Sequence, residues 1–266
     1  MLVYRSGMNV STRSLRFVTN ALRTHRRQLK TRWRVLSSHQ QALMLLAYLK
    51  KGETYRDLDV GFGVGATTTY RYLREALQVV AALAPSLEQA IQTAAEKAYV
   101  ILDGTLLRID RVAMASGGDR IYYSGKAKAH VVNVQVISDP VGRLIWASPA
   151  LPGARHDAGA AREHGIPNAL ATAGIDAFAD TAYIGAGPTI TAPFRRLRQD
   201  RGTHLFQRRE LSVGQKAVNT SISQMRAPGE RANADLKSWR ILRKSRSSPA
   251  HATILVNALQ TLILNR

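Results

Sequence analysis

The apolar residues in the first third of the chain recur with the period of amphipathic helices. In the segment 11–28, STRSLRFVTNALRTHRRQ, apolar side chains recur at Leu15, Val18 and Leu22. Residues three or four apart lie on one face of a helix, so this segment is predicted to be helical from its first Ser or Thr onward. A second helix is predicted over 37–50, where SSHQ offers capping groups and ALMLLAYL a stripe for burial.

Residues 54–83 have the pattern of two helices joined by a tight turn. The first helix is expected over Thr54–Phe62, and the second from Ala66 or Thr67 to about Leu83, with glycines in the turn between them. A compact helix, a glycine-bearing turn and a second helix form the helix-turn-helix pattern, although an ordinary helical hairpin has the same pattern. Four side chains are expected to hold the two helices together: Leu58, Val64, Tyr72 and Leu73.

The start of the second of these helices is rich in groups that can contact DNA. In a helix-turn-helix, this end points into the major groove, where hydroxyl and guanidinium groups reach base edges and phosphates. We therefore expect DNA contacts from Thr67, Thr68, Thr69, Tyr70, Arg71 and Arg74.

Beyond the helices the pattern changes to apolar and β-branched runs that are typical of strands. AYVILDGTLL indicates a strand whose apolar run ends at Asp103. AHVVNVQVISD, over 129–139, indicates another, which turns near Pro140–Arg143 into a third strand. A helix and then a further strand that ends at Asp180 follow.

The remaining chain is predicted to be helical. Helices are expected from about Leu211 to Arg226 and across GERANADLKSWRILRK, with a break at Pro228–Gly229, and after Pro249, where an apolar helix would pack on the sheet. Three strands, a helix, a strand and then helices indicate a layered α/β fold with a mixed sheet. We expect a helical region over 1–95 and an α/β domain over 96–266.

The balance of charged residues limits the possible binding partners more than the apolar content does. Lys and Arg number 38 against 18 Asp and Glu, a formal net charge of +20. Such a field attracts polyanions, and above all nucleic acid. A membrane partner is disfavoured, because no stretch reaches about 18 apolar residues. The N-terminus has no apolar run before a cleavage site, and the absence of cysteine excludes disulfides and thiolate zinc sites. We expect a cytoplasmic protein, associated with the bacterial nucleoid.

Two carboxylates at the ends of apolar strands are candidate metal ligands. Asp103 and Asp180 would each be held by a rigid backbone at the rim of the sheet, and Glu230 could supply a third carboxylate from a later helix. Mg²⁺ prefers oxygen ligands, and two such ions about 3.5–4 Å apart can catalyse phosphoryl transfer. A lone Asp at a strand end is more often a turn or helix cap, and composition and spacing leave both interpretations open.

These residues resemble the three acids of DDE transposases, in particular those of bacterial insertion sequences. Asp103 stands in ILDGTLL, Asp180 in ADTAYIG and Glu230 in RAPGERANADLK. Arg226, Glu230 and Lys237 also match the last three positions of the family's Tyr-Arg-Glu-Lys signature. The signature's Tyr is replaced by Ser at position 223, a departure that affects the role of that Tyr and not the metal ligand.

The resemblance covers nearly the whole chain, because a small helix-turn-helix module also precedes the nuclease in that family. It implies a ribonuclease H-like core, with the first acid on the first strand, the second on the fourth strand and the Glu on a helix. It further implies two Mg²⁺ ions, with Mn²⁺ as a substitute, cleavage of duplex DNA at terminal inverted repeats, and attack of the freed 3′-hydroxyl on target DNA. A homodimer or larger assembly on DNA is expected, since two ends must meet.

Several basic side chains would support the acids by contacting phosphates. The candidates are Arg226, Lys237, Lys126, His130 and His156. For the lysines the alternative is a solvated or edge-protecting charge. For the pair formed by His156 and the next residue, a helix cap through Asp157 is slightly favoured. Trp239 is expected in the core rather than stacked on a base.

Competing functions remain at this stage. A catalytically silent DNA-binding protein derived from a transposase is one, and a related metal-dependent nuclease, including a ribonuclease, is another. A glycosidase also needs two acids, but the net charge and the helix-turn-helix pattern disfavour it.

Overall fold

The computed structural model describes residues 8–30, 33–110, 118–196, 210–243 and 248–266. Its α-helices are α1 (Thr12–Gln28), α2 (Ser38–Lys51), α3 (Tyr55–Phe62), α4 (Ala66–Ala81), α5 (Leu87–Ala94), α6 (Asp157–Glu163), α7 (Ile166–Thr172), α8 (Val213–Arg226), α9 (Gly229–Lys237) and α10 (Pro249–Leu264). Its strands are β1 (Val100–Arg108), β2 (Tyr123–Ser124), β3 (Ala129–Ser138), β4 (Leu144–Ala147), β5 (Leu151–Pro152), β6 (Ala177–Phe178) and β7 (Ile190–Thr191). Short 3₁₀ helices are η1 (Gly118–Tyr122), η2 (Thr181–Tyr183) and η3 (Arg240–Leu242).

The first helices begin where the sequence predicts, because each has a side-chain cap. The hydroxyl of Ser11 accepts a hydrogen bond from the backbone N–H of Ser14 at the start of α1. Ser37 and Thr54 form capping boxes at the starts of α2 and α3. Such caps satisfy the backbone N–H groups that have no partner within the helix. The helical interpretation of this region is confirmed.

The helix-turn-helix pair is α3 and α4, joined through Gly63. This glycine ends α3 with a φ of 64°, a left-handed conformation that costs a glycine little. Leu58 and Leu73 are fully or almost fully buried, and Val64 is partly buried against the same cluster, as predicted. Tyr72 is also buried, but its hydroxyl accepts from the N–H of Leu36, 3.1 Å away, so it holds α4 to the segment before α2 rather than to α3.

The sheet is mixed and is centred on β1. Its order is β4-β3-β1-β6-β7, with the two-residue strands β2 and β5 also paired to β3. Strands β1 and β3 are antiparallel, from Ile101 opposite Ser138 to Arg108 opposite Val131. Strand β6 is parallel to β1, and β7 is parallel to β6. This arrangement confirms the predicted α/β class, with a mixed sheet behind a helical N-terminal region.

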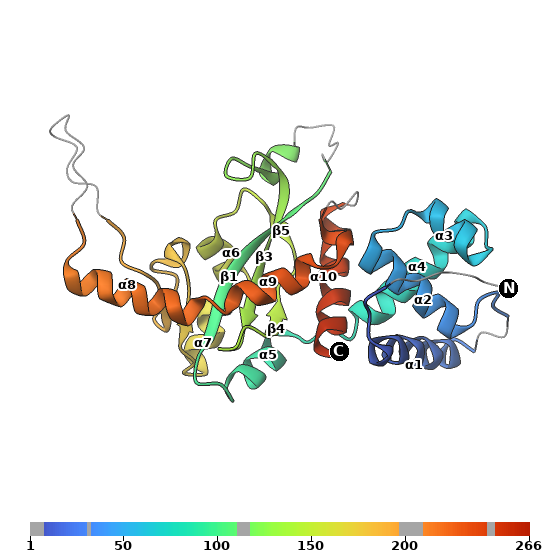
Figure 1. The fold of residues 1–266 in the computed structure, drawn as a ribbon, viewed down its shortest axis with the longest axis horizontal. Helices are drawn as coiled ribbons and strands as arrows, with labels where there is room; N and C mark the ends of the chain where they lie inside the picture. Colours follow the sequence, from blue (N-terminus) through green and yellow to red (C-terminus); the bar gives the residue numbers. More distant parts are fainter. Residues whose placement is uncertain (1–7, 31–32, 111–117, 197–209, 244–247) are drawn as a thin grey trace.

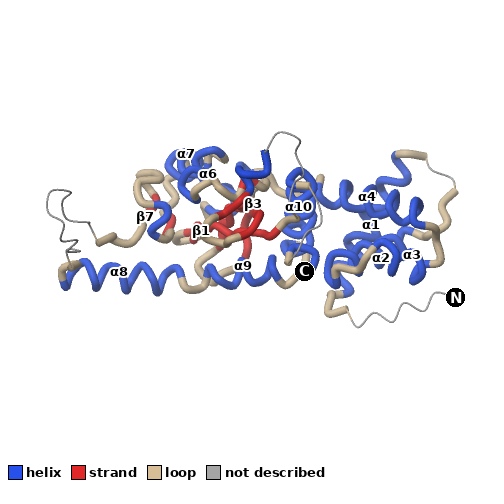
Figure 2. Tube along the Cα trace, turned by 90° about the horizontal axis from the view of Figure 1, so that it is seen from above, coloured by secondary structure: helices blue, strands red, loops and turns tan. Residues whose placement is uncertain are grey.

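Helices cover the two faces of this sheet as separate layers. Seen from above, α6 and α7 lie on one side, and α8 and α9 lie in line on the other (Figure 2). The sequence missed α7 and also α5. The helix α5, which falls inside the predicted region 1–95, packs on the sheet side, where Ala90 and Ala94 share a cluster with Val100. The indole N–H of Trp146 on β4 donates to the carbonyl of Pro85, 3.2 Å away, just before α5.

The last helix, α10, lies between the sheet and the helices α1–α4 (Figure 1). Its apolar side chains, such as Leu255 and Leu259, are fully buried in one cluster that also contains Leu45 of α2 and Val134 of β3. The prediction that this helix packs on the sheet is confirmed, and the same helix also joins the N-terminal helices to the core. No helix in the described ranges is long and apolar enough to cross a membrane.

Candidate active site

Asp103 lies within β1 rather than at its end, which corrects the sequence-based placement. The strand continues to Arg108 because β3 pairs with it along its whole length. On the other edge, β6 pairs with β1 only at Val100 and Ile101. Asp103 therefore lies two residues beyond the point where the parallel pairing stops, beside an open edge.

Asp180 lies beside Asp103 because of the strand register. Phe178 of β6 pairs with Ile101 of β1 in parallel, and each acid follows its partner by two residues. Parallel neighbours at the same level are about 5 Å apart. The carboxylate of Asp180 also accepts a hydrogen bond from the N–H of Ala182 at 2.8 Å, which caps η2. It is thus both a cap and a neighbour of the first acid.

The helix α9 brings the third acid to the same place. Its first residue, Gly229, lies so close to β1 that an added Cβ would be 2.6 Å from Ile101 Cγ2. One turn later, Asn233 Nδ2 donates to Asp103 Oδ2 at 2.7 Å. Glu230 is exposed and precedes Asn233 by three residues, so the two side chains share a helix face.

The turn between β3 and β4 also supports the start of α9. Gly142 has a φ of 82°, and an added Cβ there would overlap the carbonyl of Pro228. Arg231 Nη1 donates to the carbonyl of Val141 in the same turn, 3.3 Å away. The first turn of α9 is therefore fixed between this turn and β1.

Burial raises the pKa of Asp103 to about 6, and the carboxylates of Glu230 and Asp180 add to the rise. The Arg226 guanidinium and the Gly104 N–H oppose it. A buried carboxylate next to two others favours a divalent cation, and all three offer the oxygen donors that Mg²⁺ prefers. The residues present thus fit such an ion. Within the described ranges, however, no three acid or imidazole side chains converge closely enough to hold a metal in their present conformations.

The predicted break between the two helices is confirmed, and it places Arg226 at the site. α8 ends at Arg226, and α9 begins at Gly229. Ala227 and Pro228 keep right-handed helical angles between them, which explains why the two helices lie in line in both views (Figures 1 and 2). Arg226 Nη2 lies 4.0 Å from Asp103 Oδ1.

Other predicted supporting residues lie elsewhere. Lys237 is exposed at the far end of α9. His130 is six residues along β3 from Val136, the partner of Asp103, a separation of about 20 Å. It stacks edge-on against Tyr123 of β2, with ring centroids 5.5 Å apart. The structure therefore does not bring His130, or Lys126 in the turn before it, to the acids, because β3 leads away from them.

His156 and Asp157 lie at the start of α6, which packs on β3 from the face opposite α9. His156 is exposed and is itself the N-cap residue, so the expected cap through Asp157 is wrong. Asp157 Oδ1 instead accepts a hydrogen bond from Asn133 Nδ2 at 2.7 Å. It lies against Gly104, where an added Cβ would overlap it.

Sequence reasoning missed a buried polar network beneath the acids. Asn133 Oδ1 accepts from Gln135 Nε2 at 2.7 Å, and the hydroxyl of Tyr183 donates to Gln135 Oε1 at 2.6 Å. Burial raises the pKa of Tyr183, so its hydroxyl stays protonated. The signal available was polar residues alternating within the apolar run VVNVQV on β3, a pattern that places both side chains on one face of the sheet.

The predicted DNA-contacting residues of α4 differ in exposure. Thr67 and Arg71, four residues apart, are exposed on one face, and Thr68 is partly exposed. Thr69 is fully buried in the packing of the helix pair. It therefore offers no group to DNA, and the expectation for this residue is corrected. Trp239 is buried, as expected, with Lys50 Nζ 4.8 Å from its ring centre.

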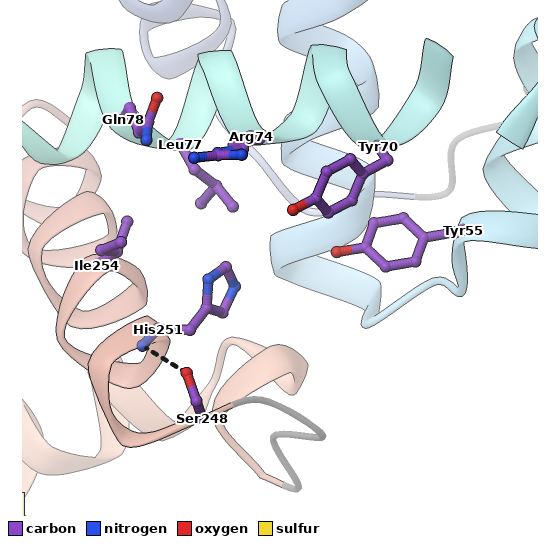
Figure 3. A pocket seen from close by; sticks show the side chains of 8 residues that line it. All are labelled: Tyr55, Tyr70, Arg74, Leu77, Gln78, Ser248, His251 and Ile254. Atoms are coloured by element: carbon purple, nitrogen blue, oxygen red, sulfur yellow. Dashed lines mark hydrogen bonds between the residues drawn. The ribbon is translucent and has the colours of Figure 1, made fainter. Parts of the chain in front are cut away.

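Tyr70 and Arg74 face a cavity of about 330 Å³ between the helix pair and α10. Figure 3 shows Tyr55 and Tyr70 next to each other, with Arg74 above and His251 of α10 opposite. The two tyrosine rings meet edge to face at 6.0 Å. None of Asp103, Asp180 and Glu230 lines this cavity, so it is separate from the site that these three residues form, called the acid site below.

Known proteins match both parts of the chain. The family described as helix-turn-helix of DDE superfamily endonuclease matches residues 34–86, and the family described as DDE superfamily endonuclease matches residues 102–263. A protein of Streptomyces albus G, provisionally named as the transposase for insertion sequence element IS112, is 31% identical over 212 residues, which cover 79% of this chain and 73% of that protein. No solved structure matches. The chain thus belongs to the DDE transposase family, as a DDE superfamily endonuclease preceded by a helix-turn-helix.

Proposed function

We propose that this protein is a transposase that binds transposon-end DNA and catalyses metal-dependent strand cleavage and strand transfer. The observation that carries the proposal is the register of β1 and β6, which puts Asp103 and Asp180 each two residues beyond the same parallel pair, with Glu230 one turn before the Asn233 that bonds to Asp103. Family membership supports an endonuclease, and divalent metal ions are general in that superfamily.

In this proposal Asp103, Asp180 and Glu230 hold Mg²⁺, or Mn²⁺ in its place. When bound, such ions supply an activated water and stabilise the leaving oxygen of the phosphodiester. Asp103 and Asp180 are fixed by the sheet and by the η2 cap. The exposed Glu230, whose carboxylate already acts on the pKa of Asp103, would complete the set. Asn233 keeps Asp103 oriented through its hydrogen bond of 2.7 Å.

Arg226 has a separate task at the scissile phosphate. Its guanidinium lies 4.0 Å from Asp103 and offsets part of the negative charge there. A planar guanidinium binds phosphate oxygens in a fixed geometry. Arg226 would therefore orient the phosphate that the acids cleave.

The exposed face of α4 would read the transposon end. Thr67 and Arg71 are exposed on one face of its N-terminal half, the half that a helix-turn-helix inserts into the major groove. Arg71→Ala should weaken binding to duplex DNA, and an unchanged affinity at every salt concentration would refute this contact. Two ends must meet for transposition, so the active form would be a dimer or larger assembly on DNA.

The test is cleavage of a duplex that carries the terminal inverted repeats flanking the coding sequence. With Mg²⁺ the wild-type protein should cut the duplex, and Asp103→Asn should abolish cutting while DNA binding persists. Asp176→Asn is the matched control, because Asp176 is exposed and lies four residues before Asp180. Binding without cutting by the wild type would favour a catalytically silent DNA-binding protein. Cutting by Asp103→Asn would refute the acid assignment.

A further inference from the structure

A basic groove runs along the open edge of β1 beyond the acids. It has a volume of about 550 Å³ and lies between the end of β1, the last turn of α9 and the segment after it. Arg108, Lys237 and Arg243 line it, and all three side chains are exposed. Its floor is apolar, with Leu106, Leu107 and Leu242. No acidic side chain lines it among the described residues.

This groove is continuous with the acid site, because β1 and α9 run side by side in the same direction. Three successive contacts between α9 and β1 show this. Gly229 lies against Ile101, and Asn233 donates a hydrogen bond to Asp103. Further along, Lys237 lines the groove together with residues 106–108. Beyond Ile101, β6 no longer covers this edge of β1. A strand bound at the acids could therefore continue along the groove.

The lining of the groove matches the chemistry of a nucleic-acid backbone. Three positively charged side chains with no acidic side chain beside them attract phosphates, and the apolar floor of the groove suits contact with deoxyribose rings. We propose that this groove binds the phosphodiester backbone of the DNA strand that enters the acid site, and that Arg108 and Arg243 contact its phosphates together with Lys237. The inference rests on the proposed function and adds a substrate-binding surface to it.

The distances define which phosphates are bound. Lys237 is seven residues beyond Glu230 on the helix, or about 10 Å along its axis. Arg108 is five residues beyond Asp103 on the strand, or about 17 Å. Since a duplex carries one phosphate per about 3.4 Å of axis in each strand, the groove lies about three to five nucleotides from the scissile phosphate.

The test is the salt dependence of DNA binding, measured without metal so that cleavage plays no part. A fluorescein-labelled duplex with the terminal repeat is titrated in EDTA with the wild type and with the double variant Arg108→Ala/Arg243→Ala. Each phosphate contact contributes about 0.9 to the slope of log Kd against log salt concentration. Losing two contacts should lower that slope by about 1.8.

Two further variants separate charge from folding. Arg108→Lys/Arg243→Lys keeps both charges and should restore the slope. Arg13→Ala/Arg16→Ala removes two exposed charges at the start of α1 and should leave the slope as in the wild type. An unchanged slope in Arg108→Ala/Arg243→Ala would overturn the groove even if the wild type cuts DNA. Conversely, absence of Mg²⁺-dependent cutting by the wild type would refute the proposed function and leave the slope measurement to decide the groove.

Discussion

The helices α1–α4 and the acid site are stabilised by contacts of very different range. Ser11, Ser37 and Thr54 bond to backbone groups only three residues away, and each bond fixes the start of one helix. At the acid site, Asn233 reaches Asp103 across 130 residues of sequence. Local contacts cost little chain entropy to form, whereas long-range contacts depend on the whole sheet. A lost cap should therefore weaken one helix, while a shift of α9 should impair catalysis.

The helix α10 is the exception that joins the two regions. Its buried face belongs to a cluster that includes both Leu45 of α2 and Val134 of β3. Substitutions in α10 should therefore destabilise the N-terminal helices and the sheet together, whereas substitutions at a helix cap or at the acid site should affect one region.

The largest expected effect is at the centre of α10. Leu255→Ala removes a fully buried side chain, and the lost packing and the cavity should lower the free energy of unfolding by about 2–5 kcal/mol. Both DNA binding and cutting should then fail at a lower temperature. Denaturant unfolding measures the loss, with Leu264→Ala, at a side chain that is 42% exposed, as control. A loss confined to one of the two activities would contradict the shared core.

The contact of α9 with β1 is the next most sensitive point. Gly229→Ala should push α9 off Ile101, because the new Cβ would lie 2.6 Å from a methyl group. A displacement near 1 Å can lower a catalytic rate about 10²-fold. Gly214→Ala is the control within α8, where an added Cβ meets only Ser212 Oγ at 4.0 Å. Equal cutting rates for both variants would show that the close approach of α9 does not position the site.

In the absence of metal, the buried carboxylate of Asp103 should lower the free energy of unfolding. Its ionisation is disfavoured by burial and by the neighbouring acids, so Asp103→Asn should raise the free energy of unfolding by about 1–2 kcal/mol at neutral pH. The pKa is raised to about 6 in the folded protein, so the wild type binds its proton more tightly when folded and loses stability as pH rises from about 4 to 6. The advantage of the variant should therefore vanish near pH 4. Thermal melts in EDTA measure it, and an equal advantage at pH 4 and pH 7 would contradict this cause.

The smallest effect is expected at a helix cap. Ser37→Ala removes the hydroxyl that accepts from the N–H of Gln40, 3.2 Å away, and should cost about 1 kcal/mol of stability. Ser37→Asp should restore most of it, and cutting should be unchanged in both at low temperature. A defect in cutting would show that this cap acts beyond its own helix.

The sequence predicts the helical region and the hairpin turn accurately because their determinants are local. The starts of α1–α3 follow from hydroxyl residues ahead of apolar stripes, and the turn before β4 follows from the Pro140–Arg143 segment. The extent of β1 is not predicted, because Leu106–Arg108 form a strand only through pairing with β3. The signals of α5 are local as well: Ser86 and Gln89 form a capping box, and Leu87, Ala90, Ile91 and Ala94 have helical spacing, so this helix could have been predicted. The helix α7 has seven residues, too few for a clear apolar period, and its burial depends on the sheet.

The candidate site is predicted only in part for the same reason. Resemblance proposes the three acids and Arg226, and the structure places Asp180, Glu230 and Arg226 near enough to Asp103 to act on its pKa. His130 follows Asp103 closely in the sequence but lies far from it in the structure. The register of β1 and β3 puts Val136, and not His130, opposite Asp103. The hydrogen bond from Asn233 to Asp103 and the burial of Thr69 depend on which face of α9 and of α4 packs inward. That face is set by the elements against which each helix packs.

The most direct test of the account compares two acids of α9 in one assay. Glu230 faces the side of Asp103, while Asp235 lies 3.3 Å from Arg266 on another side of the helix. Mg²⁺-dependent cutting of the terminal-repeat duplex is measured for Glu230→Gln and Asp235→Asn, with DNA binding measured in parallel. Glu230→Gln should bind but not cut, while Asp235→Asn should cut at nearly the wild-type rate. Cutting by Glu230→Gln at the wild-type rate would contradict the claim that α9 completes the active site.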